Sequence, residues 1–512
     1  MLARKDFIDG WNLFFIFVAL CIFVWWLICY CIFNINVKLV CPYSVIAVVL
    51  LSFTYKLNSF LQIKTKSFLY NFGLVYNCDM SYNYDISTSK KDGHANRGLA
   101  VCHTFATVID LFISTFLIAH LYSFSNGVYN YCFKAGLFQL ITYSCMLITY
   151  FLFSFWVAKT NRIWLYRLAI IMRSTVVVFS IFFGKQIAKY IWLAGMLDGC
   201  SKGMYWSTYN VLKQEMVSRT SIKGFSVFTY VLTKCANVVF PITIGALIEI
   251  STFSQVSIYV LIICAIQLAV SFAVRAHKPE NSDFNIPDFF KRLKQNPPMY
   301  DKIKDVYKLS LLYGTTSVLR IMMSVCIMIQ CGSNFSLGAI TSVVAIAIIT
   351  TTLLFNKFTK EGKRSWLMLI MAFVPILGAL SFAIWPCMAT VIIFNFCEGI
   401  SGVFYIVPFD IIRNRDLKEA GLYQDIAEHQ AMVEIILCFV RVLCYALVVL
   451  LSFANSPIVF NVIMILSAVA YSINIIATML YERKYAKQRQ QQQNANQIEN
   501  TQMEISNNQN NN

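Results

Sequence analysis

Stretches of about 20 consecutive, predominantly apolar residues recur along almost the whole chain, and no other feature limits its fold so strongly. A helix of about this length crosses the hydrocarbon core of a bilayer. The composition agrees, because 58% of the residues are hydrophobic and only 13% are charged, whereas soluble domains have about 25% charged residues. A water-soluble globular fold is excluded, and the sequence predicts an all-α polytopic membrane protein.

The order of the apolar runs predicts the organisation of the chain. Two runs come first, and the first of them, residues 11–33, is too long for the apolar core of a signal peptide. Six runs, a charged connector and six further runs follow, which makes fourteen expected spans. The expected divisions are a transmembrane hairpin at 1–56, a cytoplasmic polar linker at 57–103, a six-helix half at 104–274, a central cytoplasmic loop at 275–308, a second six-helix half at 309–482 and a disordered Gln/Asn-rich tail at 483–512.

The formal net charge of +17 arises mainly from lysines and arginines in the connectors between spans. Connectors rich in Lys and Arg alternate with connectors that have none, such as residues 250–255 and 331–338. This is the pattern of the positive-inside rule, so both termini and the central loop are expected in the cytoplasm and no nucleic-acid partner is implied. No transit or retention signal is recognised, and the plasma membrane is therefore the expected location.

The sequence gives no sign of a cofactor or of an enzyme site. The 17 cysteines lie largely inside apolar runs without the spacing of metal ligands, and the five histidines are dispersed. A Gly-rich phosphate loop is not found either. We therefore expect no metal, no cofactor and no enzymatic activity, and a polytopic membrane enzyme is kept only as an alternative.

The two expected halves share short motifs at a constant spacing. Arg162-x-Trp164 recurs 202 residues later as Arg364-x-Trp366. Asp198-Gly199, followed by the segment 209–213 (Tyr-Asn-Val-Leu-Lys), recurs 200 residues later as Glu398-Gly399 followed by the segment 409–413 (Phe-Asp-Ile-Ile-Arg). This recurrence predicts an internal repeat of the six-helix unit.

With this repeat, residues 100–482 resemble the major facilitator superfamily. The resemblance implies two six-helix halves related by an axis along the membrane normal, with a solute site between them near the midplane. The chain departs from the family's usual motif after the second helix, because residues 156–162 keep the bases but lack the glycine and the acid. The N-terminal hairpin and the tail fall outside the resemblance.

Charged residues within the expected spans are the candidates for a functional site, since each costs about 2.5–3.5 kcal/mol at a helix centre. Arg320 is the predicted anchor for the solute, because a guanidinium binds carboxylate or phosphate through two parallel hydrogen bonds. Tyr205, Trp206 and Tyr405 are added to the solute site because they follow the acid-Gly pairs of the two halves. Glu398, Asp110 and Asp198 are the candidates for proton coupling.

The other charges are assigned structural or gating roles: Arg173, Lys202, Lys234, Arg441, Arg162 and Arg364. Explanations without a role in proton coupling remain open for the acidic residues. Asp198 and Lys202 are four residues apart on one helix face and can pair with each other. Glu398 can pair with Arg441, and Asp110 can be a solvated acid at a helix end. Glu434 is expected to lie at the interface between the membrane and the cytoplasm.

The predicted function is secondary active transport of a small anionic or zwitterionic solute by alternating access, coupled to protons as a symporter or antiporter. The excess of basic over acidic residues within the spans favours an anionic or zwitterionic solute. The expected partners are the lipid bilayer and the solute, and the expected state is a monomer. A sensor or scaffold that retains the fold without transport is the main alternative.

Overall fold

The computed structural model describes residues 86–217, 222–274, 284–358, 365–419, 425–454 and 456–510. The described residues from Ser87 onward belong to one compact unit. The expected N-terminal hairpin at 1–56 and Arg364 lie outside the described residues. Every regular element in the described ranges is a helix, which confirms the all-α prediction.

The described residues between 86 and 271 form six long helical segments, which are called rods here and are counted as the first half. The first rod is built from α3, a short π-helical segment η1 and α4, joined without a break in helical backbone angles. The bounds are α3 (Ile86–Leu111), η1 (Phe112–Leu117), α4 (Ile118–Tyr122), α5 (Val128–Lys159), α6 (Arg162–Phe183), η2 (Gly184–Gln186), α7 (Ile191–Met216), α8 (Ile222–Ile250) and α9 (Phe253–Ser271).

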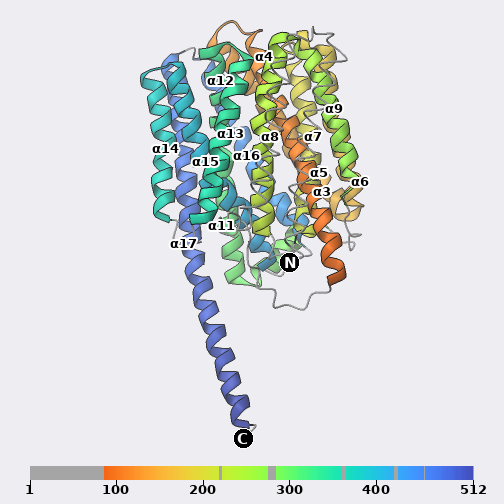
Figure 1. Ribbon diagram of the computed structural model, residues 1–512, viewed down its shortest axis with the longest axis vertical. Coiled ribbons are helices and arrows are strands. Elements are labelled where there is room, and N and C mark those ends of the chain that lie inside the picture. The colour runs from red at the N-terminus through yellow and green to blue at the C-terminus, as the bar shows by residue number, and fades with distance from the viewer. Residues whose placement is uncertain are drawn as a thin grey trace, which may run out of the picture. The chain divides into compact units, whose positions relative to one another are not determined.

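A short amphipathic helix, α10 (Ile286–Lys294), precedes the second half. The first rod of that half consists of α11 (Pro297–Thr315) and α12 (Ser317–Cys331). The remaining helices are α13 (Asn334–Phe358), α14 (Ser365–Ile384), α15 (Met388–Glu419), α16 (Ile426–Ser452) and α17 (Pro457–Asn510). In Figure 1, α14, α15 and α17 lie on one side of the bundle and α6 and α9 on the other.

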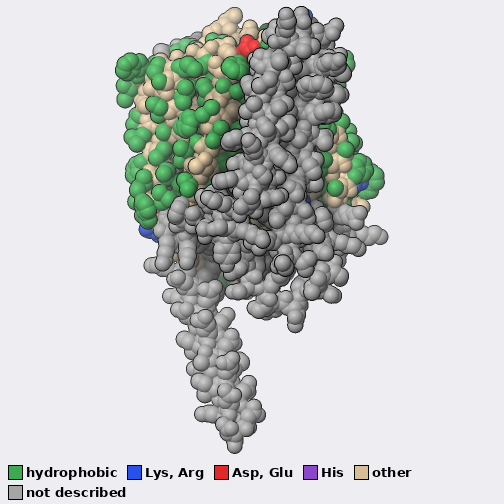
Figure 2. Space-filling view, viewed as in Figure 1, with side chains coloured by type: hydrophobic (Ala, Val, Ile, Leu, Met, Phe, Trp, Pro, Cys, Tyr) green, Lys and Arg blue, Asp and Glu red, His purple; other side chains and the backbone are tan. Residues whose placement is uncertain are grey.

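Eleven rods of the described ranges are long and apolar enough to cross a membrane. The 26-residue α7 is long enough as well but less apolar, since Asp198 and Lys202 lie near its middle. On the face in Figure 2, most of the coloured side chains on the visible described surface are hydrophobic, and few charged side chains are seen there. Large apolar side chains such as Trp164, Phe182 and Ile384 are exposed, as expected for surfaces that contact lipid.

Two expected boundaries are corrected by the structure. Helix α3 begins at Ile86, within the segment 57–103 that was predicted to be a polar linker. Helix α17 continues to Asn510, through the tail at 483–512 that was predicted to be disordered (Figure 1). Both extensions continue a transmembrane helix, and adding residues to an existing helix avoids the unfavourable nucleation step that makes isolated polar helices unstable.

The packing of the helices reflects the internal repeat. Helix α5, the second rod of the first half, packs along α16, the fifth rod of the second half. Helix α13, the second rod of the second half, packs along α8, the fifth rod of the first. Exchanging the two halves turns one pair into the other. These two helix pairs form the main apolar contacts between the halves.

Two glycines at the predicted spacing of 200 occupy equivalent packing positions. A Cβ atom on Gly199 of α7 would lie 2.3 Å from the carbonyl oxygen of Thr142 on α5. A Cβ atom on Gly399 of α15 would lie 2.6 Å from a methyl carbon of Val344 on α13. In both halves the fourth rod therefore approaches the second through a glycine, as small residues permit between membrane helices.

We expect Gly199→Val to destabilise the protein by about 1–3 kcal/mol, because the added side chain overpacks a contact with rigid backbone. The measurement is the thermal melting temperature of the detergent-purified protein. Gly224→Val is the matched control, since a Cβ atom there would have no neighbour within 4 Å. Equal melting temperatures for the two variants would show that α5 and α7 are not packed as described.

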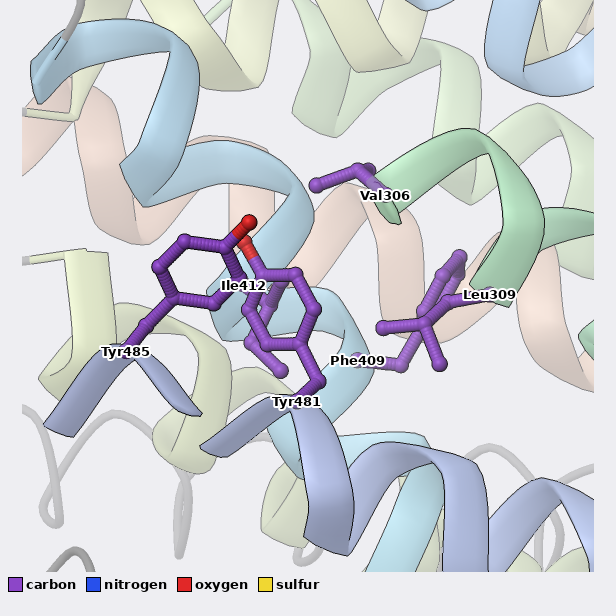
Figure 3. Close-up of a cluster of buried hydrophobic side chains, with 6 residues drawn as sticks. All are labelled: Val306, Leu309, Phe409, Ile412, Tyr481 and Tyr485. Atoms are coloured by element: carbon purple, nitrogen blue, oxygen red, sulfur yellow. The ribbon is translucent and has the colours of Figure 1, made fainter. Parts of the chain in front are cut away.

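A buried cluster joins three helices of the second half at the end where the basic connectors lie, which we call the basic end. Val306 and Leu309 of α11, Phe409 and Ile412 of α15 and Tyr481 and Tyr485 of α17 pack together (Figure 3). Asp305 lies beside this cluster and accepts hydrogen bonds from Lys484 at 2.7 Å and from the Tyr485 hydroxyl at 3.0 Å. The cluster fixes α11, α15 and α17 relative to one another.

Candidate functional site

Four charged side chains form a buried network in the first half. Arg173 of α6 pairs with Asp110 of α3, and Lys202 of α7 pairs with Asp198 at 2.6 Å. The Lys202 Nζ atom also lies 3.7 Å from Asp110. Two acids therefore balance two bases. Arg173 and Asp198 are fully buried, whereas the Asp110 side chain keeps 23% of its surface exposed.

This network settles two of the alternatives left open by the sequence. The pairing of Asp198 with Lys202 is confirmed. The interpretation of Asp110 as a solvated acid at a helix end is wrong, because its carboxylate is engaged by Arg173 and lies near Lys202. Removing one member of such a buried pair costs about 3–5 kcal/mol. The network therefore holds α3, α6 and α7 together.

An aromatic stack lies next to this network. The Tyr205 hydroxyl is 3.1 Å from His103 Nδ1 and 3.4 Å from the Tyr166 hydroxyl. The ring of Tyr209 stacks on His103 at 4.1 Å, and Trp206 meets the same imidazole edge-on. Tyr205 is fully buried. It packs between helices and has no exposed surface in this structure.

A second group of polar residues, called here the central group, gathers around Glu398 and Tyr405 of α15. It consists of Arg320 (α12), Glu398 and Tyr405 (α15), Tyr471 (α17), Tyr313 (α11), and Tyr230 and Lys234 (α8). The rings of Tyr313 and Tyr405 are 5.4 Å apart, and those of Tyr405 and Tyr471 are 4.7 Å apart. Five helices thus contribute to the group, and α8 is the one from the first half.

Arg320 is exposed although its neighbours Leu319 and Ile321 on α12 are buried. The groups whose charges or dipoles act on it are Glu398, Tyr405, Tyr313 and Tyr471, all from the second half. We infer that its exposed surface faces the interior between the halves and not the lipid. Among the described residues it forms no ion pair within 4.0 Å.

Glu398 is held by Tyr471, whose hydroxyl donates to the Glu398 carboxylate at 3.1 Å. The predicted alternative partner, Arg441, points elsewhere, because its guanidinium lies over the ring of Tyr143 at 5.0 Å. No ion pair between Glu398 and Arg441 is found in the described part of the chain, so that alternative is wrong. The hydrogen bond with Tyr471 leaves Glu398 free of a basic partner within 4.0 Å among the described residues.

At the basic end, polar contacts join the two halves and are called here the inter-half lock. Lys213 of α7 contacts both carboxylate oxygens of Asp410 of α15, at 2.6 and 2.8 Å. Gln214 donates to the side-chain oxygen of Asn414 at 2.9 Å. Because Gln214 and Asn414 are equivalent positions of the repeat, this contact indicates that the local two-fold axis passes between them.

A third part of the lock centres on Glu434 of α16. Its carboxylate accepts from Arg413 at 2.8 Å and from Asn210 of α7 at 3.1 Å. The Glu434 side chain is 6% exposed, so the prediction that it lies at the interface between the membrane and the cytoplasm is wrong. Arg162 lies elsewhere at this end, where it pairs with Glu215 and donates to the carbonyl of Val157.

Comparison with known proteins supports the architecture. No family model matches the sequence, and no curated protein matches it. Among solved structures, the human organic anion transporter MFSD10 (TETRAN) superposes with a TM-score of 0.50 at 10% identity, over 76% of this chain and 99% of that one. The chain has the major facilitator fold. A variant of the E. coli fucose:proton symporter FucP matches with a TM-score of 0.49 at 12% identity, over 74% of this chain and 97% of that one.

The lock residues join α7 of the first half to α15 and α16 of the second. In the sequence, Lys213, Asp410 and Arg413 were interpreted only as marks of the repeat. The missed signal was that a base recurs near the ends of two equivalent helices, while the position three residues before it is an acid, Asp410, in the second half alone.

We expect the Lys213–Asp410 pair to show energetic coupling. Asp410→Ala leaves the largely buried Lys213 without its partner and should destabilise the protein by about 1.5–3 kcal/mol, the usual contribution of a hydrogen bond to a charged group. Lys213→Ala should cost a similar amount, and the double variant should cost less than the sum of the two. Melting temperatures of the four purified proteins measure this cycle. Simple additivity would mean that the two residues do not interact.

Proposed function

We propose that the protein is a secondary active transporter that moves a small anionic solute by alternating access, with proton coupling at Glu398. The observation that carries the proposal is Arg320, whose side chain is exposed between buried neighbours of α12 and forms no ion pair within 4.0 Å among the described residues. An unpaired base in the middle of a membrane protein is costly, and such residues mark solute pathways. The guanidinium supplies the planar set of donors that suits a carboxylate or a phosphate.

The distribution of charge supports an anion over a neutral solute. In the buried network of the first half, two acids balance two bases. In the central group Glu398 is the one carboxylate that acts on the two bases Arg320 and Lys234. A zwitterionic solute is the second candidate, because Glu398 offers a carboxylate that an ammonium group can approach. The human neighbour is described as an organic anion transporter, but at 10% identity the proposal rests on the charges of this chain.

We further propose that the basic end, with the inter-half lock and the C-terminus, faces the cytoplasm. The support is the concentration of Lys and Arg in the connectors at this end, which is the positive-inside pattern. The protein in this conformation then has its halves joined on the cytoplasmic side. Placement in the plasma membrane and a monomeric state are proposed on the sequence alone.

The test is solute flux in proteoliposomes that contain the purified protein and have an imposed pH gradient. The panel is radiolabelled succinate, glutamate, phosphate and glucose. We expect at least one anion to accumulate above its external concentration and to be released when a protonophore collapses the gradient. Glucose should not accumulate. Absence of flux for every solute, from correctly folded protein, would favour the sensor or scaffold.

A further inference from the structure

Helices α7 and α15 occupy equivalent places in the two halves, and residues 200 positions apart along them have equivalent surroundings. Both helices approach the second rod of their half through a glycine. The ring of Tyr209 on α7 stacks on His103 of the first rod at 4.1 Å. The ring of Phe409 on α15 stacks on Tyr313, in the first rod of the second half, at 4.6 Å. Contacts on α7 can therefore be compared with those on α15 position by position.

The acid at this register is held in different ways in the two halves. In the first half, Asp198 is fully buried and pairs at 2.6 Å with the ammonium of Lys202, one turn further along α7. In the second half, Glu398 is half-buried, and Gly402 stands at the position equivalent to Lys202. Glycine has no side chain that could pair with the acid. The exchange of Lys202 for Gly402 therefore removes the base that holds the equivalent acid of the first half.

The hydroxyl of Tyr471 on α17 occupies the space beside Gly402. A Cβ atom on Gly402 would lie 2.5 Å from this hydroxyl oxygen, whereas the next two atoms would be at ordinary contact distances of 3.4 and 3.7 Å. The hydroxyl oxygen is 3.1 Å from the Glu398 carboxylate and 3.1 Å from the carbonyl oxygen of the same residue. Tyr471 is buried, and its ring packs on Tyr405 at 4.7 Å. Gly402 thus leaves room for a neutral hydroxyl next to the acid.

The two ways of holding an acid differ in how they respond to a proton. Protonation of Asp198 would deprive the buried ammonium of Lys202 of its closest counter-charge, which is strongly unfavourable. A phenol hydroxyl, in contrast, both donates and accepts hydrogen bonds. The Tyr471 hydroxyl donates to the charged carboxylate of Glu398. Once Glu398 is protonated, the same hydroxyl can donate to the carbonyl oxygen and accept from the carboxyl group, so both forms of the acid keep a partner.

We propose that Gly402 and Tyr471 are positioning residues that allow Glu398 to exchange a proton, and that the Tyr471 hydroxyl sets the pH range of this exchange. The inference rests on the proposed function in taking Glu398 as the coupling residue. It deepens that function, because it names the feature that distinguishes Glu398 from the equivalent Asp198. Tyr471 does not carry the proton, and Gly402 acts only by leaving the hydroxyl in contact with the acid.

Other titratable groups around Glu398 stay in place when the hydroxyl is removed. Helix α14, which packs along α15, is described in full and has no titratable side chain. Helix α13 meets α15 at Gly399 through apolar side chains. The remaining groups whose charges act on Glu398 are Arg320 on α12, Lys234 and Tyr230 on α8, and Tyr405 on α15 itself. Since none of them is changed in the test, a shift in the titration of Glu398 reports on the hydroxyl.

The test follows the titration of Glu398 through the infrared band of its protonated carboxyl group, in purified protein reconstituted into lipid. Glu398→Gln identifies the band, because it removes this carboxyl group alone. Tyr471→Phe removes the hydroxyl, and Gly402→Ala displaces it with one added carbon. Gly399→Ala is the matched control, since its Cβ atom overpacks the same helix against Val344 and not against the hydroxyl. The double variant Gly402→Ala/Tyr471→Phe shows whether the glycine acts through the hydroxyl.

Tyr471→Phe and Gly402→Ala should each raise the midpoint of the titration by about one pH unit, because a hydrogen bond that favours the charged form is lost. Gly399→Ala should lower the melting temperature and leave the midpoint unchanged. The double variant should match Tyr471→Phe, because the added carbon no longer meets an oxygen. If Gly402→Ala does not fold, the double variant decides, since the oxygen in conflict with the added carbon is absent from it.

Three results would overturn the proposal: no band that Glu398→Gln removes, an unchanged midpoint in Tyr471→Phe, or a midpoint in the double variant that differs from that of Tyr471→Phe. The infrared titration does not depend on transport. A midpoint that responds to Tyr471 and Gly402 in a protein without flux would keep the positioning role and reject the transporter. Anion accumulation driven by protons, with a midpoint that neither variant moves, would keep the transporter and reject the positioning role.

Discussion

Arg320→Gln is expected to abolish anion transport while leaving the protein folded. The guanidinium has no ion pair within the described part of the chain, and its side chain is exposed, so its removal leaves no buried acid without a partner. Loss of two hydrogen bonds to a charged solute group, each worth about 1.5–3 kcal/mol, predicts a fall of at least about 100-fold in the uptake rate at low solute concentration. Initial rates in proteoliposomes and a melting curve measure the two parts of the prediction.

Arg320→Lys separates the charge of this residue from its shape. The ammonium retains the positive charge but loses the planar arrangement of donors, so transport should fall by about tenfold or more. Arg173→Gln is the matched arginine control, because Arg173 is fully buried and pairs with Asp110. It should lose folding stability by about 3–5 kcal/mol. Wild-type transport by Arg320→Gln, or a loss of stability as large as that of Arg173→Gln, would exclude Arg320 as the solute anchor.

The sequence was sufficient to predict the features that depend on local composition. The spans follow from the length of the apolar runs, and the Asp198–Lys202 pair follows from a spacing of four on one helix. The repeat was visible because equivalent residues recur at a constant distance. Gly199 and Gly399 occupy equivalent contacts for the same reason.

Partners on different helices could not be predicted in the same way. Arg173 pairs with Asp110 because particular faces of α6 and α3 meet, and nothing in the sequence determines which faces these are. The partners of Glu434 were not predictable from the sequence either. It was assigned to the interface between the membrane and the cytoplasm because it lies close to the end of its helix. Its burial results from α7 and α15 closing over it at the basic end.

The central group shows why a list of intramembrane charges does not identify a site. Lys234 and Arg441 had the same standing in the sequence, as single bases within apolar runs. Both lie over a tyrosine ring in the structure, Arg441 over Tyr143 and Lys234 over Tyr230. Which ring or charge each base meets is a property of the fold that their positions in the sequence do not reveal.

Glu398→Gln is expected to abolish uphill accumulation of the solute while preserving exchange across the membrane. Protonation of Glu398 removes the one negative charge that acts on Arg320 and Lys234, so the protonated site has two positive charges in excess and binds an anion more strongly. By linkage, anion binding and protonation favour each other, which predicts proton symport. Glutamine resembles the protonated carboxyl in shape and cannot release a proton.

Three measurements in proteoliposomes examine this prediction: accumulation driven by a pH gradient, exchange at equal pH, and the pH dependence of anion affinity. For Glu398→Gln, accumulation should disappear, exchange should remain within a few-fold of the wild type, and affinity should no longer vary with pH. Tyr471→Phe is the matched control, because it removes the hydroxyl that donates to Glu398 but keeps the carboxylate. It should retain accumulation with an altered pH dependence. If Glu398→Gln still accumulates the anion, the coupled proton is carried elsewhere, and the partly exposed Asp110 becomes the residue to test.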